Sequence, residues 1–372
     1  MVCLASYAKI VAMKVGLVYD PIYLEHDTGS HPENSQRLVA IMSHLEETGL
    51  KKKLTSLTPR PATIQELEMV HSPEYISRIK REAEILRRPS PPPTLSGEGR
   101  AACWLDPDTV ICSRSYEVAL YAAGGVLTAV EAVMNGGVDT AFALVRPPGH
   151  HATHDRAMGF CIFNNVAIAA KFALANFNLS RVLIADFDVH HGNSTQETFY
   201  ADPKVLYFST HQYPFYPGTG WIDEIGVGEG EGTTVNFPMI AGWGDEEYLR
   251  AFNEVLVPVA QRFRPELILV SAGFDSHWAD SIAMMQVSII GFAQMVVVLK
   301  KLATDLCQGR LVFTLEGGYN LQVAAASTKA TFDVLLDSPE ITDPLGKSSR
   351  VRHEGFEGRI KKIKQIHHIV KS

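Results

Sequence analysis

The stretch RVLIADFDVHHGNSTQ, residues 181–196, decides the fold. It opens with the apolar run VLIA, of the kind found in parallel strands that are covered on both faces. Asp186, Asp188 and His190 then follow at alternate positions. Because alternate side chains of a strand point to the same face, the pattern predicts two carboxylates and an imidazole on one side of the end of a buried strand.

Strand-like segments recur along the chain and alternate with helical patterns. The predicted strands are 15–20, 140–145, 181–189, 205–211, 267–275 and 310–318, and the clearest helical stretches are 115–137 and 244–263. This alternation predicts a single-domain α/β fold with a mostly parallel sheet flanked by helices. We divide the chain into an N-terminal extension (1–12), one catalytic domain (13–345) and a basic C-terminal tail (346–372). Residues 86–109, rich in Pro, Gly and Ser, are expected to form a long surface loop, and 359–372 a solvated helix.

Composition narrows the class of protein. The 372 residues are 46% apolar and 20% charged, as in an ordinary globular protein. The formal net charge of −7 does not favour binding to the negatively charged backbone of nucleic acid. No apolar run is expected to span a membrane. The five cysteines are odd in number and lack a CxxC spacing, which argues against a disulfide framework and favours a reducing compartment, the cytoplasm. The sequence leaves the oligomeric state open.

Polar clusters follow four of the predicted strands. They are RPPGHH (146–151), DVHHGN (188–193), GFDSH (273–277) and EGGYN (316–320). In parallel α/β sheets, ligands bind beyond the carboxyl ends of the strands. We therefore expect the clusters to converge on one rim and to form the active site there.

Asp186 and Asp188, at the end of the 181–189 strand, predict a metal ion. Burying a carboxylate is costly unless a cation or hydrogen-bond donors compensate it, and no Lys or Arg lies nearby in sequence. Asp188, His190 and Asp275 offer two oxygens and one nitrogen with an open position, which is a catalytic arrangement. Asp186 would lie behind them and accept a hydrogen bond from an imidazole. The competing interpretation, carboxylates satisfied in the core or capping a helix, explains one Asp better than this whole pattern.

The first and last clusters carry candidate proton-transfer groups. His150 and His151 follow a Pro-Pro-Gly turn, and adjacent histidines permit one to act as a base while the other holds a proton. Asp186 and Asn193 are available to orient them. Tyr319 could direct a phenol at a developing oxyanion, although an ordinary packing tyrosine fits its position equally well.

Seven motifs in order carry a family resemblance: HPENSQR, RPPGHH, GFCIFNN, DFDVHHGN, PGTG, SAGFD and EGGYN, from His31 to Asn320. Together they resemble the zinc-dependent deacetylase family of histone deacetylases, acetylpolyamine amidohydrolases and acetoin-utilisation proteins, with motifs nearest to class II histone deacetylases. The resemblance implies an arginase-like α/β fold and a single Zn²⁺ held by Asp188, His190 and Asp275. It also implies that Tyr319 polarises the substrate carbonyl.

The resemblance implies further site residues. Gly159, Phe160 and Tyr216 match the wall of a narrow acyl-lysine tunnel, and Arg37 matches an arginine near an acetate exit. A structural K⁺ site matches Asp186, Asp188, His190, Ser209 and Thr210. Ile282 falls where polyamine-selective members place a glutamate, and Asn193 where class I enzymes carry Asp. The rim carboxylate has no clear match, with Asp106 and Asp108 as candidates.

These observations predict hydrolysis of the acetamide of acetyl-lysine, or of a related acylated amine, through a zinc-bound water with His151 as base. The expected partners are an acetylated lysine peptide or protein, or a small acetylated amine, but no nucleic acid and no membrane. Three further functions fit less well: a small-molecule amidohydrolase of the acetylpolyamine type, an arginase-like dimanganese ureohydrolase with His277 near a second ion, and a non-catalytic acyl-lysine binder.

Overall fold

A computed structural model describes residues 13–87 and 102–369. Its centre is an eight-stranded sheet with the order β2-β1-β5-β10-β9-β6-β7-β8. All of its strand pairs are parallel. The strands are β1 Val15–Val18, β2 Thr55–Leu57, β5 Thr140–Ala143, β6 Val182–Asp186, β7 Val205–Gln212, β8 Thr234–Met239, β9 Leu267–Ala272 and β10 Leu311–Leu315. The predicted parallel α/β sheet is therefore confirmed.

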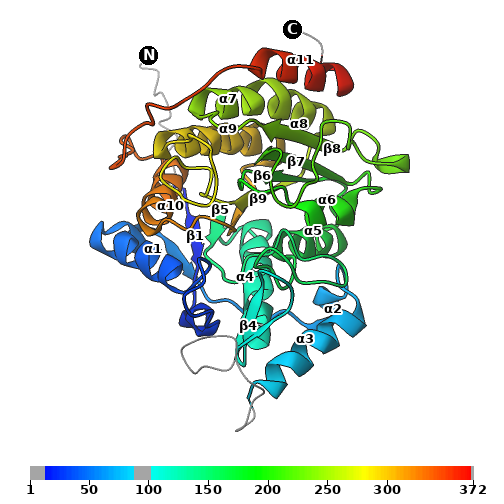
Figure 1. Cartoon of the computed structure of the whole chain (residues 1–372), viewed down its shortest axis with the longest axis vertical. Coiled ribbons are helices and arrows are strands. Elements are labelled where there is room, and N and C mark those ends of the chain that lie inside the picture. The colour runs from blue at the N-terminus through cyan, green and yellow to red at the C-terminus, as the bar shows by residue number, and fades with distance from the viewer. Residues whose placement is uncertain (1–12, 88–101, 370–372) are drawn as a thin grey trace, which may run out of the picture.

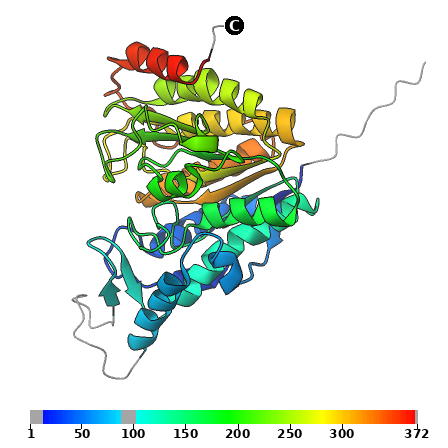
Figure 2. The ribbon, with the colours of Figure 1, turned by 90° about the vertical axis from the view of Figure 1, so that its right-hand side faces the viewer.

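Helices cover both faces of this sheet (Figures 1 and 2). The α-helices are α1 Gln36–Glu47, α2 Ile64–Leu67, α3 Pro73–Ile85, α4 Ser115–Met134, α5 Asn165–Asn176, α6 Asn193–Phe199, α7 Asp245–Ala251, α8 Val257–Phe263, α9 Ile289–Cys307, α10 Leu321–Leu335 and α11 Phe356–Ile366. Short 3₁₀ turns occur at Pro21–Glu25, Leu50–Lys53 and Gly228–Gly230, and a π-helical turn, η4 Phe252–Leu256, joins α7 to α8. Helices α4 and α5 pack on one face, and α9 packs on β9 and β10 from the other.

The central strands consist of apolar residues because both of their faces are covered. Every residue of β5, β6, β9 and β10 is buried. Polar side chains gather where these strands end, and there local signals turn the chain. Asn320, for example, caps α10 by accepting hydrogen bonds from the backbone N–H groups of Gln322 and Val323, which fixes the preceding Tyr319 at the strand end.

Helix α4 corrects one expectation. By length and composition it could cross a membrane, although no such run was expected from the sequence. In the structure 61% of the most apolar 18-residue stretch of this helix is buried, and the helix packs against β1, β5 and α5. Its apolar character is therefore explained by the core.

Two other segments differ from the sequence expectations. Residues 102–104 of the expected surface loop form β3 Ala102–Trp104, which pairs antiparallel with β4 Val110–Cys112; residues 88–101 lie outside the described part. The C-terminal helix α11 is not fully solvated, because Phe356, Ile360 and Ile363 are at most 3% exposed and belong to the core. This helix lies across α7 and α8 at the edge of the molecule (Figure 1).

Candidate active site

The four polar clusters meet at one rim of the sheet. Strands β5, β10, β9 and β6 are neighbours in that order, so their carboxyl ends lie together as predicted. Between them opens a cavity of about 250 Å³. It is lined by Asp108, Pro148, His150, His151, Gly159, Phe160, His190, Phe215, Tyr216, Ile282, Gly317 and Tyr319.

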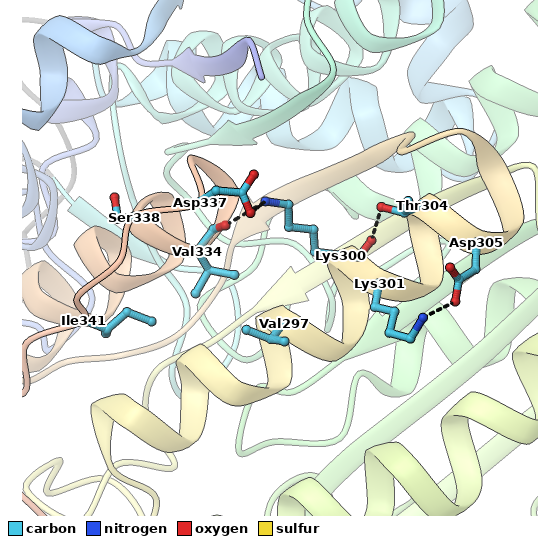
Figure 3. A pocket seen from close by; sticks show the side chains of 9 residues that line it. All are labelled: Val297, Lys300, Lys301, Thr304, Asp305, Val334, Asp337, Ser338 and Ile341. Carbon is cyan, nitrogen blue, oxygen red and sulfur yellow. Dashed lines mark hydrogen bonds and ion pairs between the residues drawn. The ribbon is translucent and has the colours of Figure 1, made fainter. Parts of the chain in front are cut away.

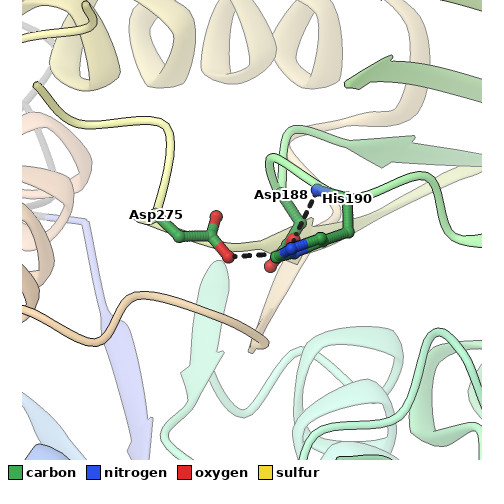
Figure 4. A group of neighbouring side chains, drawn as sticks. All are labelled: Asp188, His190 and Asp275. Carbon is green, nitrogen blue, oxygen red and sulfur yellow. Dashed lines mark hydrogen bonds and ion pairs between the residues drawn. The ribbon is translucent and has the colours of Figure 1, made fainter. Parts of the chain in front are cut away.

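Asp188, His190 and Asp275 form a candidate metal site (Figure 4). One ligand atom from each lies within 4.8 Å of the others, and all three residues are buried. His190 Nδ1 is 3.1 Å from Asp188 Oδ1 and 3.3 Å from Asp275 Oδ2. In the part of the chain that the structure describes, Asp275 Oδ2 has no hydrogen-bond partner, and this imidazole is its ionic neighbour. Carboxylate oxygens and imidazole nitrogens are donors that bind divalent metal ions such as zinc in proteins.

The backbone around these ligands leaves no room for additional side chains. A Cβ atom at Gly273 would lie 2.0 Å from Asp188 Oδ2, and one at Gly317 would lie 2.2 Å from Asp275 Oδ2. The Gly317 N–H donates to Asp188 Oδ2 at 2.8 Å, and the Val189 N–H donates to Asp275 Oδ1 at 2.9 Å. The chain thus packs glycines and amide donors against the two acids and fixes their orientation.

The pKa values of Asp275 and His190 are those expected of a site that binds a cation. Burial and the neighbouring Asp188 raise the pKa of Asp275 to about 6. Burial alone would lower the pKa of His190, but Asp188 and Asp275 raise it to about 9. Protons therefore compensate the buried acids when no cation does so, and a divalent ion at the same place would displace them.

The two histidines of the first cluster differ in their orienting partners. His150 Nδ1 lies 3.0 Å from Asp186 Oδ2, and His151 Nδ1 lies 2.7 Å from Asn193 Oδ1. The rings are neighbours, with centroids 4.0 Å apart. The two orienting residues named from the sequence thus contact one histidine each. Because an amide oxygen can only accept, His151 carries its proton on Nδ1 and leaves Nε2 as the basic nitrogen.

The partners also separate the pKa values of the pair. Burial alone would lower the pKa of His150, but the carboxylates of Asp186 and Asp188 raise it to about 10. Burial, together with His150 and His190, lowers the pKa of His151 well below its ordinary value. One imidazole is thus charged at neutral pH and the other is neutral, a combination typical of an acid and a base in one site.

Aromatic rings form the wall of the cavity. The Tyr216 ring lies edge-on to His151 at 5.2 Å, and the Phe160 ring lies edge-on to Tyr319 at 5.6 Å. Gly159 adopts φ +57°, and a Cβ atom there would lie 2.3 Å from a ring carbon of His151, so the residue must be glycine. Burial and Asp275 raise the pKa of Tyr319 well above its usual value, which keeps its hydroxyl a donor.

Comparison with known proteins identifies this architecture. Residues 31–335 match the family model described as "Histone deacetylase domain". Histone deacetylase 10, chloroplastic, of Oryza sativa subsp. japonica is 40% identical over 327 residues, covering 85% of this chain and 72% of the relative. A probable deacetylase of Archaeoglobus fulgidus is 39% identical over 319 residues, covering 85% and 84%. The chain belongs to the histone deacetylase family.

A solved structure agrees with this assignment. The crystal structure of the HDA15 HD domain superposes with a TM-score of 0.83 at 35% identity and covers 95% of this chain and 94% of that one. The family resemblance and the deacetylase fold expected from the sequence are thereby confirmed. Family membership makes the protein a hydrolase of the deacetylase type, and the family is generally metal-dependent.

In this histone deacetylase fold, Arg37 contacts Tyr319, which lines the cavity. It is fully buried, and its guanidinium lies 5.0 Å from the centroid of the Tyr319 ring. Its Nε donates to the Gly318 carbonyl at 2.7 Å, and its Nη1 lies 3.2 Å from Glu33 Oε1. Glu33 also binds Arg146 at 2.6 Å, and although burial alone would raise the pKa of Glu33, the two arginines lower it to about 2.

The residues expected to hold K⁺ are all buried. Ser209 pairs in register with Asp186 across β6 and β7, and its Oγ contacts His211 Nδ1 at 2.8 Å. Thr210 Oγ1 has no hydrogen-bond partner in the residues described.

Of the two candidate rim carboxylates, only Asp108 lines the cavity. Its Oδ1 accepts from the Gly159 N–H at 2.9 Å, which attaches the β3–β4 hairpin to the tunnel wall. Asp106 instead accepts from the backbone N–H groups of Asp108 and Thr109 and shapes the turn. This division could not be read from the sequence, because both acids lie in the same short turn.

Three residues of the site were not predicted. Phe215 stacks on His190 with centroids 5.4 Å apart. Asp280 Oδ2 accepts from the N–H groups of Tyr319 and Asn320 at 2.7 and 2.8 Å, and so holds the tyrosine loop. Glu316 is buried against the histidine turn. All three lie within or next to the recognised motifs, but their contacts are mainly to backbone and rings, which side-chain patterns do not reveal.

A second groove contrasts with this cavity (Figure 3). It has a larger volume, about 430 Å³, and lies between α9 and the chain after α10. Lys300 donates to the carbonyls of Val334 and Leu335 and pairs with Asp337, while Lys301 pairs with Asp305. The charges of the groove are therefore used to end α10 and stabilise α9, and nothing there resembles a reactive group.

Proposed function

We propose that the protein hydrolyses the acetamide of Nε-acetyl-lysine, with one Zn²⁺ held by Asp188, His190 and Asp275. The buried ligand trio beside one neutral and one charged imidazole is the observation that carries this proposal. Bound there, zinc would polarise the acetyl carbonyl and increase the acidity of a water molecule.

The side chains of the cavity divide the proton transfers. His151, oriented by Asn193 and neutral at pH 7, takes a proton from the attacking water at Nε2. His150, held charged by Asp186, stabilises the negative charge that develops next to it. The imidazolium of His151 then returns its proton to the leaving amine, and the Tyr319 hydroxyl donates to the oxyanion.

The cavity favours an extended aliphatic acyl-amine. Phe160 and Tyr216 stand on its wall, where they would exclude water and contact the lysine stem. Ile282 lines the cavity without charge, so a polycationic amine finds only Asp108 as an acid among the lining residues described. A peptide or protein acetyl-lysine is therefore proposed over a small acetylated polyamine.

The described residues favour neither a dimanganese ureohydrolase nor a purely binding protein. A dimanganese ureohydrolase needs a second set of ligands, yet residues 13–87 and 102–369 contain only one group of three suitable side chains. His277 is not part of it, and its Nδ1 accepts from the Ala279 N–H. A purely binding protein would not need the separated imidazole pKa values.

We also propose a K⁺ site and a compartment. K⁺ would lie at Asp186, Asp188, His190, Ser209 and Thr210, where it would offset the acids behind the zinc. The described cysteines are free thiols, which fits a reducing compartment such as the cytoplasm, and the rice relative is named chloroplastic.

Acetate release tests the function. Zinc-loaded protein should release acetate from an acetyl-lysine peptide faster than it releases acetate from acetylputrescine or the longer carboxylate from a longer-chain acyl-lysine peptide. Faster release from acetylputrescine would favour a small-molecule amidohydrolase, and binding of the peptide without any acetate release would favour a binding protein.

A further inference from the structure

Glu316, the residue that follows β10, directs its side chain at the turn that carries the histidine pair. The residue is fully buried. Its Oε2 accepts from the Gly149 N–H at 2.7 Å and from the His150 N–H at 3.3 Å. Its Oε1 accepts from the Ser271 hydroxyl at 3.2 Å. No Lys or Arg side chain in the described residues forms an ion pair with this carboxyl group, so its hydrogen-bond partners are neutral donors.

We propose that Glu316 is a positioning residue for the reaction, and that its carboxyl oxygen fixes the Gly149–His150 turn and thereby the two imidazoles. This inference rests on the proposed function. Two backbone N–H groups share one acceptor, and a buried donor left without a partner is destabilising, so this oxygen holds the turn. The other side of the turn is packed closely, because a Cβ atom at Gly149 would lie 2.5 Å from the Asn165 nitrogen.

The same segment also fixes the metal side of the site. The neighbouring Gly317 N–H donates to Asp188 Oδ2 at 2.8 Å, and Arg37 donates to the Glu316 carbonyl. The side chain of Glu316 thus orients the histidines while its backbone neighbour orients a metal ligand. One short stretch of chain therefore sets the spacing between the groups that transfer protons and the ion that they act beside.

Two substitutions separate the effect of the length of the Glu316 side chain from the effect of its charge. Glu316→Gln can accept both N–H groups with its amide oxygen and donate its NH₂ group to Ser271, so it keeps the geometry without the charge. Glu316→Asp keeps the charge but is shorter by one methylene and cannot reach the turn. We expect kcat close to wild type in Glu316→Gln and lower by roughly 10–100-fold in Glu316→Asp, with KM within about twofold, because small misplacements of catalytic groups are costly.

A readout other than turnover accompanies these rates. The Nδ1–H proton resonances of the imidazoles report the bonds to Asp186 and Asn193. They should be retained in Glu316→Gln and shifted or broadened in Glu316→Asp, with zinc content equal in both. Ser271→Ala, which removes only the third contact of the carboxyl group, is the matched control and should keep kcat.

The outcomes separate this inference from the proposed function. If Glu316→Asp is active and Glu316→Gln is inactive, the charge of residue 316 matters rather than its hydrogen bonds, and the inference is overturned. Unchanged imidazole resonances in Glu316→Asp would also overturn it, because the turn would then not depend on the reach of this side chain. If Glu316→Asp does not fold, loss of kcat or of the resonances in the folded Glu316→Gln overturns the inference. Absence of acetate release from wild-type protein contradicts the proposed function instead, and the resonances still test the positioning.

Discussion

His151 and His150 are chemically identical side chains, and only their partners make them different. Asn193 accepts from one and Asp186 from the other, at 2.7 and 3.0 Å. A neutral amide oxygen stabilises an imidazolium less than a buried carboxylate does. Burial and the neighbouring His150 and His190 lower the pKa of His151, and residue 193 decides how much of this lowering its partner offsets.

The pH at which kcat/KM falls on the acid side of its profile should depend on residue 193. Because the pKa of His151 is lowered, its neutral form persists below pH 6.5, and kcat/KM should fall only as the pH drops further. Asn193→Asp adds a carboxylate and should move this limb upward by about 1–3 pH units. Profiles of kcat/KM between pH 4.5 and 8 measure it, and a limb that does not move would exclude His151 as the base.

Tyr319→Phe removes one donor from the cavity and leaves the ring. We expect kcat to fall by roughly 10²–10³-fold, as for loss of one oxyanion donor. Binding of the peptide should change little, since the ring contact with Phe160 remains. Steady-state kinetics on an acetyl-lysine peptide provide the test, and an unchanged kcat would mean that the hydroxyl has no part in the reaction.

The polar residues of the site could be predicted because strand-end polar residues are unusual enough to be recognised, whereas the residues of the cavity wall came from the family resemblance. Asp188, His190 and Asp275 were identified in this way, and the structure places them together. Asp280 and Glu316 could not be predicted in the same way, since they act through backbone N–H groups. Such contacts depend on how loops approach one another, which a single sequence does not encode locally.

At the scale of elements, the start of α1 is joined to the sheet by a buried charge cluster. Glu33 binds Arg37 of this helix and Arg146 after β5, and all three are at most 1% exposed. Burying one carboxylate with two guanidinium groups is tolerated only while the set is complete. The cluster therefore holds α1, and with it the Arg37 contact to Tyr319, against the active-site end of the sheet.

Glu33→Gln, which removes the only carboxylate of this set of three residues, should lower the free energy of unfolding. Leaving two buried guanidinium groups without their acid should cost about 3–5 kcal/mol of unfolding free energy at pH 7. Since the folded pKa is lowered to about 2 from an ordinary 4.5, the contribution is complete above pH 4.5 and is lost as the pH falls toward 2. Urea unfolding at several pH values measures the difference between variant and wild type.

The exposed pair of Glu46 and Lys51 provides the control. Glu46→Gln should cost at most about 1 kcal/mol, because water already solvates both partners. Equal losses in the two variants would contradict a special role for the buried cluster.

Most strands of the sheet were predictable because apolar runs are local, but β2 and β8, at its two edges, lie outside the predicted segments. Strands β5, β6, β9 and β10 lie within the predicted segments. The hairpin strand β3 was missed, because three residues beside a Pro-rich stretch give little signal. Helix α4 shows the converse, since apolar composition alone does not distinguish a core helix from a membrane span.

At the scale of the whole molecule, the C-terminal helix belongs to the packed domain. The family match ends at residue 335, yet α11 buries Phe356, Ile360 and Ile363 against the core. Basic residues on its remaining face made it resemble a solvated tail. Only the tertiary structure shows which of its faces has a partner.

Ile363→Ala should therefore destabilise the entire domain. Ile363 is 0% exposed, and truncating a buried isoleucine costs about 2–5 kcal/mol. Chemical denaturation measures this loss, with Ile64→Ala as control because Ile64 is 40% exposed and its truncation should cost less than about 1 kcal/mol. A loss at Ile363 no larger than that at Ile64 would mean that α11 is not part of the cooperative unit.

The proposed activity depends on one ion at the ends of β6 and β9. The most direct measurement is acetate release from an acetyl-lysine peptide by protein stripped with a chelator and then titrated with Zn²⁺. We predict that the stripped protein is inactive and that activity returns fully at one equivalent of zinc per chain. Acetate release that survives complete metal removal, or that needs two equivalents of Mn²⁺, would contradict a single catalytic zinc ion.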